Sequence, residues 1–134
     1  IDYITTATLG NASDFGDLSD TAQVGAAVCN STRGVIAITY GGSPVGYNNT
    51  MEFITMATTG NSIDFGDRIN TATPQGGASS PIRGVFAGGY ASPGPRTNAM
   101  EFIEITTQGN GVDFGDMVTA RGMPSTVSNG HGGL

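Results

Sequence analysis

The stretch Met51-Glu52-Phe53-Ile54, followed by Gly60-Asn61 and Asp64-Phe65-Gly66-Asp67, decides the fold because the chain of 134 residues repeats it. Equivalent openings stand fifty residues earlier, at Ile1-Asp2-Tyr3-Ile4, and forty-nine residues later, at Met100-Glu101-Phe102-Ile103. Self-similarity at such a period indicates a repeat architecture, in which one small unit buries its apolar face against its neighbours.

A second shared block completes the unit. Arg33 and Arg83 each open a run of Arg-Gly-Val, then Ile or Phe, then Ala. Each run leads to a pair of glycines, and these are Gly41, Gly42, Gly88 and Gly89. The matches divide one repeat domain, residues 1–134, into a partial unit 1–32, a unit 33–82, a unit 83–131 and a terminal tail 132–134.

The local pattern predicts an all-β protein. Residues 51–58 and 100–107 place apolar side chains on both faces, which suits strands in a sheet that is covered on both sides. Residues 34–40 and 84–90 are short apolar runs whose glycines allow backbones to approach closely. No stretch has the apolar period of a helix.

Composition and charge narrow the functional classes. The formal net charge of −6, with five arginines and no lysine, would repel a phosphate backbone, so we expect no nucleic-acid partner. A single cysteine permits no intrachain disulfide. No apolar run approaches the roughly 20 residues that span a bilayer, so we expect no membrane insertion.

The order of features resembles the kelch repeat of β-propellers: a strand ending in a glycine pair, a strand carrying Glu-Phe-Ile, an aromatic residue, then Ala120-Arg121. Phe15, Phe65 and Phe114 stand where kelch repeats have tryptophan. The resemblance implies kelch-like propeller blades. An intertwined trimeric β-prism or a solenoid fibre would serve the same repeat.

The motifs Thr-Gly-Asn and Asp-Phe-Gly-Asp, together with the ending Ser128-Asn129-Gly130-His131-Gly132-Gly133-Leu134, more closely resemble those of repeat proteins from tailed bacteriophages that infect marine cyanobacteria. That resemblance implies a virion structural or tail-fibre protein, located in the extracellular particle and contacting host-surface glycans or other virion proteins. About two and two-thirds units cannot close a ring of at least four or so blades. We therefore expect association with copies of itself, as a homotrimer, or with the remainder of a longer chain.

The three Asp-Phe-Gly-Asp tetrads invite two chemical interpretations. The kinase magnesium motif is excluded because a kinase needs an essential lysine. Paired hard oxygens at a turn make calcium a weak candidate. We favour a structural role in which Asp bonds the turn, Phe packs between sheets and Gly permits the bend. The calcium candidates are Asp14, Asp17, Asp64, Asp67, Asp113 and Asp116.

Catalytic residues are not evident, and we expect no enzyme, no catalytic residue and no bound cofactor. Nucleophilic catalysis would need a base beside a serine, a threonine or Cys29, and the only histidine, His131, lies fourth from the end in a glycine-rich tail. Arg33 and Arg83 are expected to bridge to a neighbouring unit's Asp or to carbonyl groups. The loops 43–49 and 92–98 differ between units and would carry ligand-binding residues, namely Tyr47, Asn48, Asn49, Arg96 and Asn98.

Two other functions stay open. A cellular kelch-type propeller that binds proteins would need several more units in its parent chain. A glycan-active propeller enzyme would need catalytic carboxylates that converge from unlike loops.

Overall fold

The computed structural model describes residues 1–41, 46–74, 76–91 and 94–130, and these form an all-β protein. No helix occurs in those ranges, as the sequence predicts. The strands are β1 (Asp2–Tyr3), β2 (Ser13–Asp14), β3 (Ala22–Cys29), β4 (Arg33–Gly41), β5 (Gly46–Tyr47), β6 (Thr50–Thr55), β7 (Ile63–Asp67), β8 (Gly76–Ser79), β9 (Arg83–Ala87), β10 (Ala99–Glu104) and β11 (Val112–Asp116).

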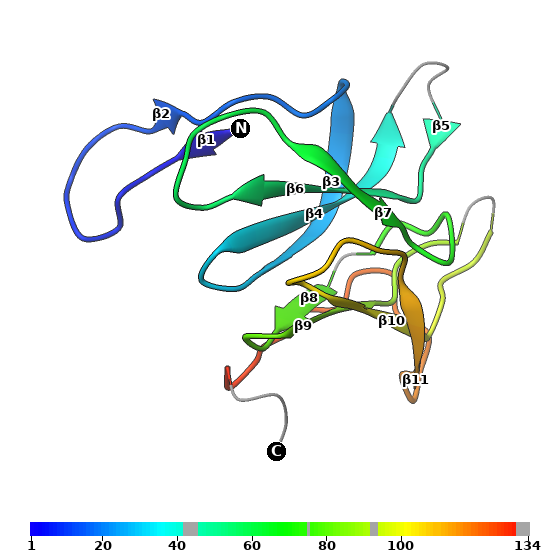
Figure 1. Cartoon of the computed structure of the whole chain (residues 1–134). Helices are drawn as coiled ribbons and strands as arrows, with labels where there is room; N and C mark the ends of the chain where they lie inside the picture. The colour runs from blue at the N-terminus through cyan, green and yellow to red at the C-terminus, as the bar shows by residue number, and fades with distance from the viewer. Residues whose placement is uncertain (42–45, 75, 92–93, 131–134) are drawn as a thin grey trace.

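The strands form three open antiparallel sheets (Figure 1). The second sheet has the order β3-β4-β6-β7, with β5 paired to β4, and the third has the order β8-β9-β10-β11. Along each of these orders the strand numbers rise, and tight hairpins join β3 to β4 and β8 to β9. The first sheet contains β1 and β2 alone. Within the described residues, none of the three sheets closes into a barrel.

The second and third sheets share their register as well as their order. Val35 faces Phe53 across β4 and β6, and Val85 faces Phe102 across β9 and β10. The next strand pair is interrupted by a β-bulge in both sheets. Glu52 faces Asp64 and Met51 faces Gly66, so Phe65 has no partner in the ladder.

The bulge corrects one expectation. The tetrads 64–67 and 113–116 lie within strands β7 and β11, so the prediction that they form turns is wrong. A bulge inserts one extra residue into a strand and bends it, and a glycine beside it relieves the strain. The Asp and Gly content therefore indicates a bent strand at these positions rather than a chain reversal.

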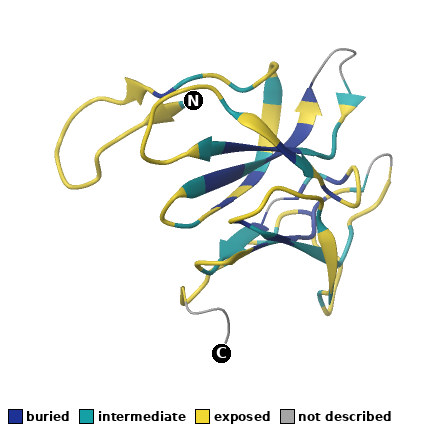
Figure 2. Ribbon diagram, viewed as in Figure 1, coloured by how far each residue is buried: buried dark blue, intermediate teal, exposed yellow. Residues whose placement is uncertain are grey.

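The core lies between the second and third sheets, and β3 packs against β8 and β9. The buried cluster joins side chains of both sheets, namely Ala26, Val28, Val35, Ala37, Met51, Phe53, Phe65, Phe86, Ile103 and Ile105. Figure 2 shows buried residues gathered along the central strands, whereas the hairpin of the first sheet is mostly exposed. Neither large sheet could bury its apolar face without the other.

The sheets are phased differently from the sequence units. The boundary between residues 32 and 33 falls inside the hairpin that joins β3 to β4, and the boundary between 82 and 83 falls inside the hairpin that joins β8 to β9. The second and third sheets therefore each combine their first strand from one sequence unit with their remaining strands from the next. The described residues include no helix that could span a membrane.

Glycine is required where β9 meets β3. A Cβ added at Gly84 would lie 2.4 Å from Cγ2 of Val28, a buried β-branched side chain with little rotamer freedom. We predict that Gly84→Ala lowers the free energy of unfolding by about 1–3 kcal/mol through overpacking. Urea denaturation followed by circular dichroism measures this change.

The matched control is Gly46→Ala, because a Cβ at Gly46 would meet nothing within 4 Å. That change should alter stability by no more than about 0.5 kcal/mol. Equal effects of the two substitutions would show that the close approach at Gly84 is not what the core requires.

Candidate functional site

The bulged tetrads hold the next sheet through main-chain hydrogen bonds. The carbonyl oxygen of Phe15 accepts the N–H of Gly60 at 2.7 Å, and the carbonyl oxygen of Phe65 accepts the N–H of Gly109 at 2.9 Å. Because the bulge removes Phe65 from its own ladder, its carbonyl group is free to face the following sheet. We call this arrangement the inter-sheet contact.

The last residue of each tetrad adds two further bonds to the inter-sheet contact. The N–H of Asp17 donates to Oδ1 of Asn61 at 3.0 Å, and its carbonyl accepts the N–H of Ser62 at 2.9 Å. Asp67 does the same with Asn110 at 3.0 Å and with Gly111 at 2.7 Å. The same three bonds thus occur twice in the molecule, at positions fifty or forty-nine residues apart.

Glycine in the tetrad makes the inter-sheet contact possible. A Cβ added at Gly16 would lie 2.3 Å from the carbonyl oxygen of Gly60, and one at Gly66 would lie 2.6 Å from that of Gly109. Both glycines also have φ values, +145° and +136°, that other residues rarely adopt. Any side chain here would push the two sheets apart.

The tetrad phenylalanines pack edge to face on the aromatic residue of the neighbouring strand. The ring pairs are Tyr3 with Phe15, Phe53 with Phe65, and Phe102 with Phe114, with centroids 6.0, 6.1 and 6.1 Å apart. Phe15 and Phe65 are 8% and 2% exposed, but Phe114 is 50% exposed. The ring pair alone therefore does not bury the tetrad phenylalanine; a following sheet does.

A glutamate from the following sheet completes each inter-sheet contact. Glu52 accepts the N–H of Ser19 at 3.2 Å and also the hydroxyl groups of Ser19 and Ser62. Glu101 accepts the N–H of Ile69 at 2.8 Å. Each carboxylate thus satisfies a main-chain donor that lies two residues beyond a tetrad, in keeping with the rule that buried polar groups are paired.

The carboxylates of Glu52 and Glu101 have different side-chain partners. Arg68 is 2% exposed, and its Nη1 lies 3.7 Å from Oε1 of Glu101. Its Nη2 donates to the carbonyl oxygens of Ile38 at 3.1 Å and Asn48 at 2.8 Å. Leu18 stands at the equivalent position in the preceding copy, and around Glu52 the hydroxyl groups of Ser19 and Ser62 take the place of the guanidinium.

Burial dominates the electrostatics of the Arg68–Glu101 pair. Burial lowers the pKa of Arg68, while Glu101 acts in the opposite direction. Burial likewise raises the pKa of Glu101, against the effects of the Ile69 hydrogen bond and the Arg68 charge. Within the described ranges, the Nε and Nη1 atoms of Arg68 have no hydrogen-bond partner, so desolvation is only partly compensated.

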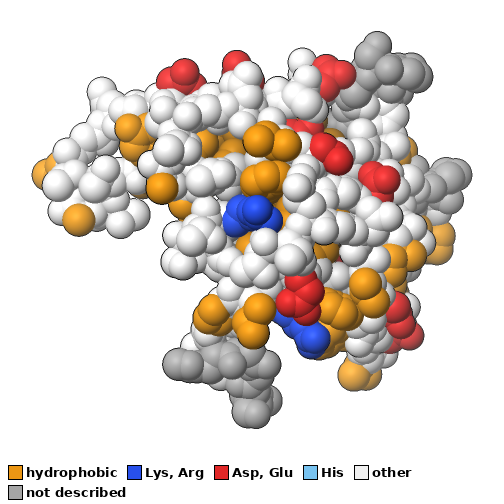
Figure 3. Space-filling view, in the orientation of Figure 1, with side chains coloured by type: hydrophobic (Ala, Val, Ile, Leu, Met, Phe, Trp, Pro, Cys, Tyr) orange, Lys and Arg blue, Asp and Glu red, His pale blue; other side chains and the backbone are white. Residues whose placement is uncertain are grey.

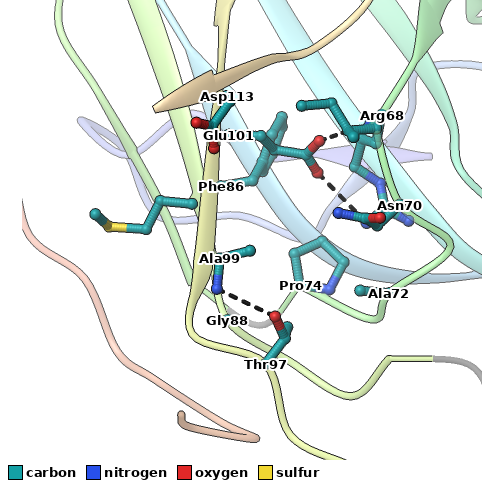
Figure 4. Close-up of a pocket in the computed structure, with 12 residues that line it drawn as sticks. Arg68, Asn70, Ala72, Pro74, Phe86, Gly88, Thr97, Ala99, Glu101 and Asp113 are labelled. Carbon is teal, nitrogen blue, oxygen red and sulfur yellow. Dashed lines mark hydrogen bonds and ion pairs between the residues drawn. The ribbon is translucent and has the colours of Figure 1, made fainter. Parts of the chain in front are cut away.

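A cavity of about 190 Å³ lies beside this pair, between the segment 68–74 that follows β7 and the third sheet. Figure 4 shows Glu101 extending from β10 toward Arg68, with Phe86, Pro74 and Ala72 forming an apolar wall. The volume is below the range typical of small-molecule sites. The contacts of Arg68 and Glu101 hold the second and third sheets together.

Arg33 and Arg83 both stack on an aromatic ring of the neighbouring strand. The guanidinium carbon of Arg33 lies 4.5 Å from the Phe53 ring centroid, and that of Arg83 lies 4.6 Å from the Phe102 centroid. Arg33 also donates to the carbonyl oxygen of Ile105, the residue that follows β10, at 3.1 Å. Arg83 instead forms an exposed ion pair with Glu104 at 2.8 Å.

The predicted ligand-loop residues fall into two groups. The amide groups of Asn49 and Asn98 donate to main-chain oxygens of Arg68 and Met117, at 3.1 and 3.5 Å, and so tie the loops to the sheets. Asn48 also caps the main chain, since its Oδ1 accepts the N–H of Thr50. The side chains of Tyr47 and Arg96 are exposed.

The glycine pairs serve close packing. A Cβ at Gly89 would lie 2.0 Å from the carbonyl oxygen of Thr73, and one at Gly41 would lie 2.4 Å from that of Thr21. Gly88 has a φ of +61°, where glycine is favoured. Gly42 and His131 lie outside the described residues.

The acidic pairs of the tetrads do not assemble into a larger cluster. Among the described residues, no group of three or more His, Cys, Asp and Glu side chains could hold a metal ion. The side chains of Asp14, Asp17, Asp64 and Asp67 are exposed. The structure therefore adds no further ligand to the weak calcium candidates.

Sequence reasoning missed Glu52, Glu101 and Arg68. The glutamates repeat at an offset of forty-nine residues, which is a visible signal for an inter-unit role. Arg68 has no equivalent charge in the other copies, where Leu18 and Met117 stand, so its burial could not be read from the repeat. No family model matches this chain, and no curated protein is significantly similar to it.

The difference between the two glutamate environments generates a prediction. Arg68→Leu introduces at position 68 the leucine that stands at the equivalent position 18. The substitution leaves the buried Glu101 carboxylate without its cation. We expect a loss of about 3–5 kcal/mol in the free energy of unfolding, the range for breaking one side of a buried pair. Urea denaturation measures it.

The matched rescue is Arg68→Leu combined with Ile69→Ser and Gly111→Ser, which recreates the hydroxyl groups that surround Glu52. We expect the triple variant to recover more than half of the lost stability. A triple variant no more stable than Arg68→Leu would show that the two glutamates do not occupy equivalent places.

Proposed function

We propose that this chain is a non-enzymatic structural and binding module whose sheets are kelch-like propeller blades, and that it belongs to a bacteriophage particle. The observation that carries the proposal is the inter-sheet contact, made twice with the same main-chain bonds. Stacking by a repeated contact is how blades and solenoid units bury their apolar faces. The tetrads, which could have been taken for metal or nucleotide motifs, have this structural use.

The surface supports a role in a particle exposed to the environment. Figure 3 shows a face covered mainly by uncharged polar side chains and backbone, with few charged groups. Only 12% of the residues are charged, about half the usual share, so hydroxyl and amide groups dominate recognition. The virion setting itself rests on the resemblance to phage repeat proteins.

The loops are the proposed binding surface. Tyr47 stacks edge to face on Tyr40 with centroids 5.3 Å apart, and both rings are partly exposed. Arg96 is exposed on the matching loop of the third sheet. Aromatic faces and guanidinium groups are suited to stack on and hydrogen-bond sugars, so a host-surface glycan is the proposed ligand.

Binding by the loops can be tested with lipopolysaccharide extracted from marine cyanobacteria. We expect the purified chain to bind it in biolayer interferometry, and Tyr47→Ala or Arg96→Ala to weaken binding about tenfold, the effect of one lost contact of about 1.4 kcal/mol. The control is Ile82→Ser. Ile82 is exposed and immediately precedes β9, at the end of that strand away from the loop that carries Arg96. Unchanged binding in both loop variants would contradict the proposed surface, and release of new reducing ends would indicate an enzyme instead.

The particle assignment has its own test. Antibodies raised against the purified chain should label purified particles of cyanobacterial tailed phages in immunogold electron microscopy, because a structural protein is present in every particle. Pre-absorption with the chain is the control. Labelling of host-cell extracts without labelling of particles would favour a cellular protein-interaction propeller.

A further inference from the structure

The third sheet carries an inter-sheet contact surface that no described residue occupies. Phe114 is 50% exposed, against 2% for Phe65 at the equivalent position. Val118, which follows the tetrad as Ile69 does, is 105% exposed, against 50% for Ile69. A Cβ added at Gly115 would meet nothing within 4 Å, whereas one at Gly66 would collide with Gly109. We call this the trailing face.

The first sheet carries the complementary half. Gly10 and Asn11 are equivalent to Gly60-Asn61, the turn that binds the tetrad of the preceding sheet, and both are exposed. Ile4 is 64% exposed, whereas at the equivalent positions Ile54 is half-buried and Ile103 is 2% exposed. Asp2 stands at the position of the bridging glutamates and is also exposed. We call this the leading face.

We propose that the leading face of one molecule binds the trailing face of a second copy, head to tail, by the same inter-sheet contact that the chain makes twice within itself. The proposal goes beyond the proposed function, because the contact would form whether the chain belongs to a particle or to a cell.

The bonds follow residue by residue from the two internal contacts. The N–H of Gly10 would donate to the carbonyl of Phe114, as Gly60 does to Phe15 and Gly109 does to Phe65. Oδ1 of Asn11 would accept the N–H of Asp116, as Asn61 and Asn110 do for their own tetrads.

Two further groups complete the match. The N–H of Ala12 would donate to the carbonyl of Asp116, as Ser62 does to Asp17. The carboxylate of Asp2 would accept the N–H of Val118, as Glu101 does for Ile69, although its side chain is one methylene shorter. The apolar part of the contact would bury Ile4 and Phe114, whose equivalents Ile103 and Phe65 are buried inside the molecule.

The chemistry selects a second copy over an unrelated partner. The trailing face requires a glycine, an Asn side chain and a main-chain donor in one turn, because the internal contacts use all three and allow almost no space above the tetrad glycine. The leading face supplies this set within residues 10–12. Since the two faces differ, the contact is heterologous and leads to a closed ring or an open fibre.

Sedimentation velocity on the purified 134-residue chain tests the proposal. The wild-type chain should associate as its concentration rises through the micromolar range. Phe114→Glu would bury a carboxylate in the contact, and Gly10→Val/Asn11→Glu would remove the turn on the opposite face. Each should weaken association about thirtyfold or more, as loss of a buried interface anchor does. Phe114→Leu, which keeps the face apolar, is the matched control and should associate like wild type.

Mixing the two blocked variants gives the sharper result. Each keeps one intact face, so an equimolar mixture should form a one-to-one dimer and nothing larger, while each variant alone stays monomeric. Circular dichroism verifies that both variants are folded. A wild-type chain that remains monomeric, a blocked variant that associates like wild type, or a mixture without the dimer would overturn the proposal. A closed trimer and an open fibre of the wild-type chain would each support it.

Discussion

The rest of this molecule depends on the main-chain carbonyl group of Phe65, which bonds to the following sheet and not to a strand of its own sheet. The bulges opposite Met51 and Met100 exclude Phe65 and Phe114 from the ladders of their own sheets. A buried main-chain oxygen without a partner would destabilise the fold, so the Phe65 carbonyl requires a donor from outside its sheet. The turn at Gly109 supplies that donor, and the two sheets are thereby fixed in one relative position.

The remaining features of the inter-sheet contact follow from this requirement. The sheets can approach closely enough only if the residue after phenylalanine is glycine, and the Asn side chain then reaches the next N–H. The bridging glutamate pairs the donor two residues further on. Directional bonds therefore set the orientation of the sheets, and the apolar cluster between them supplies the larger, non-directional share of stability.

Sequence reasoning predicts the strands around residues 51 and 100 and the need for glycine at close approaches, because both depend on local pattern. It predicts the tetrads as turns, because Asp and Gly favour turns when only neighbouring residues are considered. The strand geometry of 64–67 is stabilised by residues more than forty positions away, and such contacts override local propensity. The burial of Arg68 is unpredictable for the same reason, since its carbonyl partners come from another strand and a loop.

The chain contains three copies of the Asp-Phe-Gly-Asp tetrad in different surroundings. Comparing them shows which features come from the tetrad itself and which come from the neighbouring sheet. The local chemistry is shared, since all three phenylalanines make the same ring pair within their own sheets. The exposure of Phe114 differs sharply from that of Phe15 and Phe65, and the described structure differs there in one respect, the presence of a following sheet. The trailing face presents Phe114 and Val118 to solvent, and the leading face presents Ile4. In the proposed head-to-tail contact, burial of Ile4 and Phe114 would remove apolar surface from water, which is also the driving force that packs the second sheet on the third.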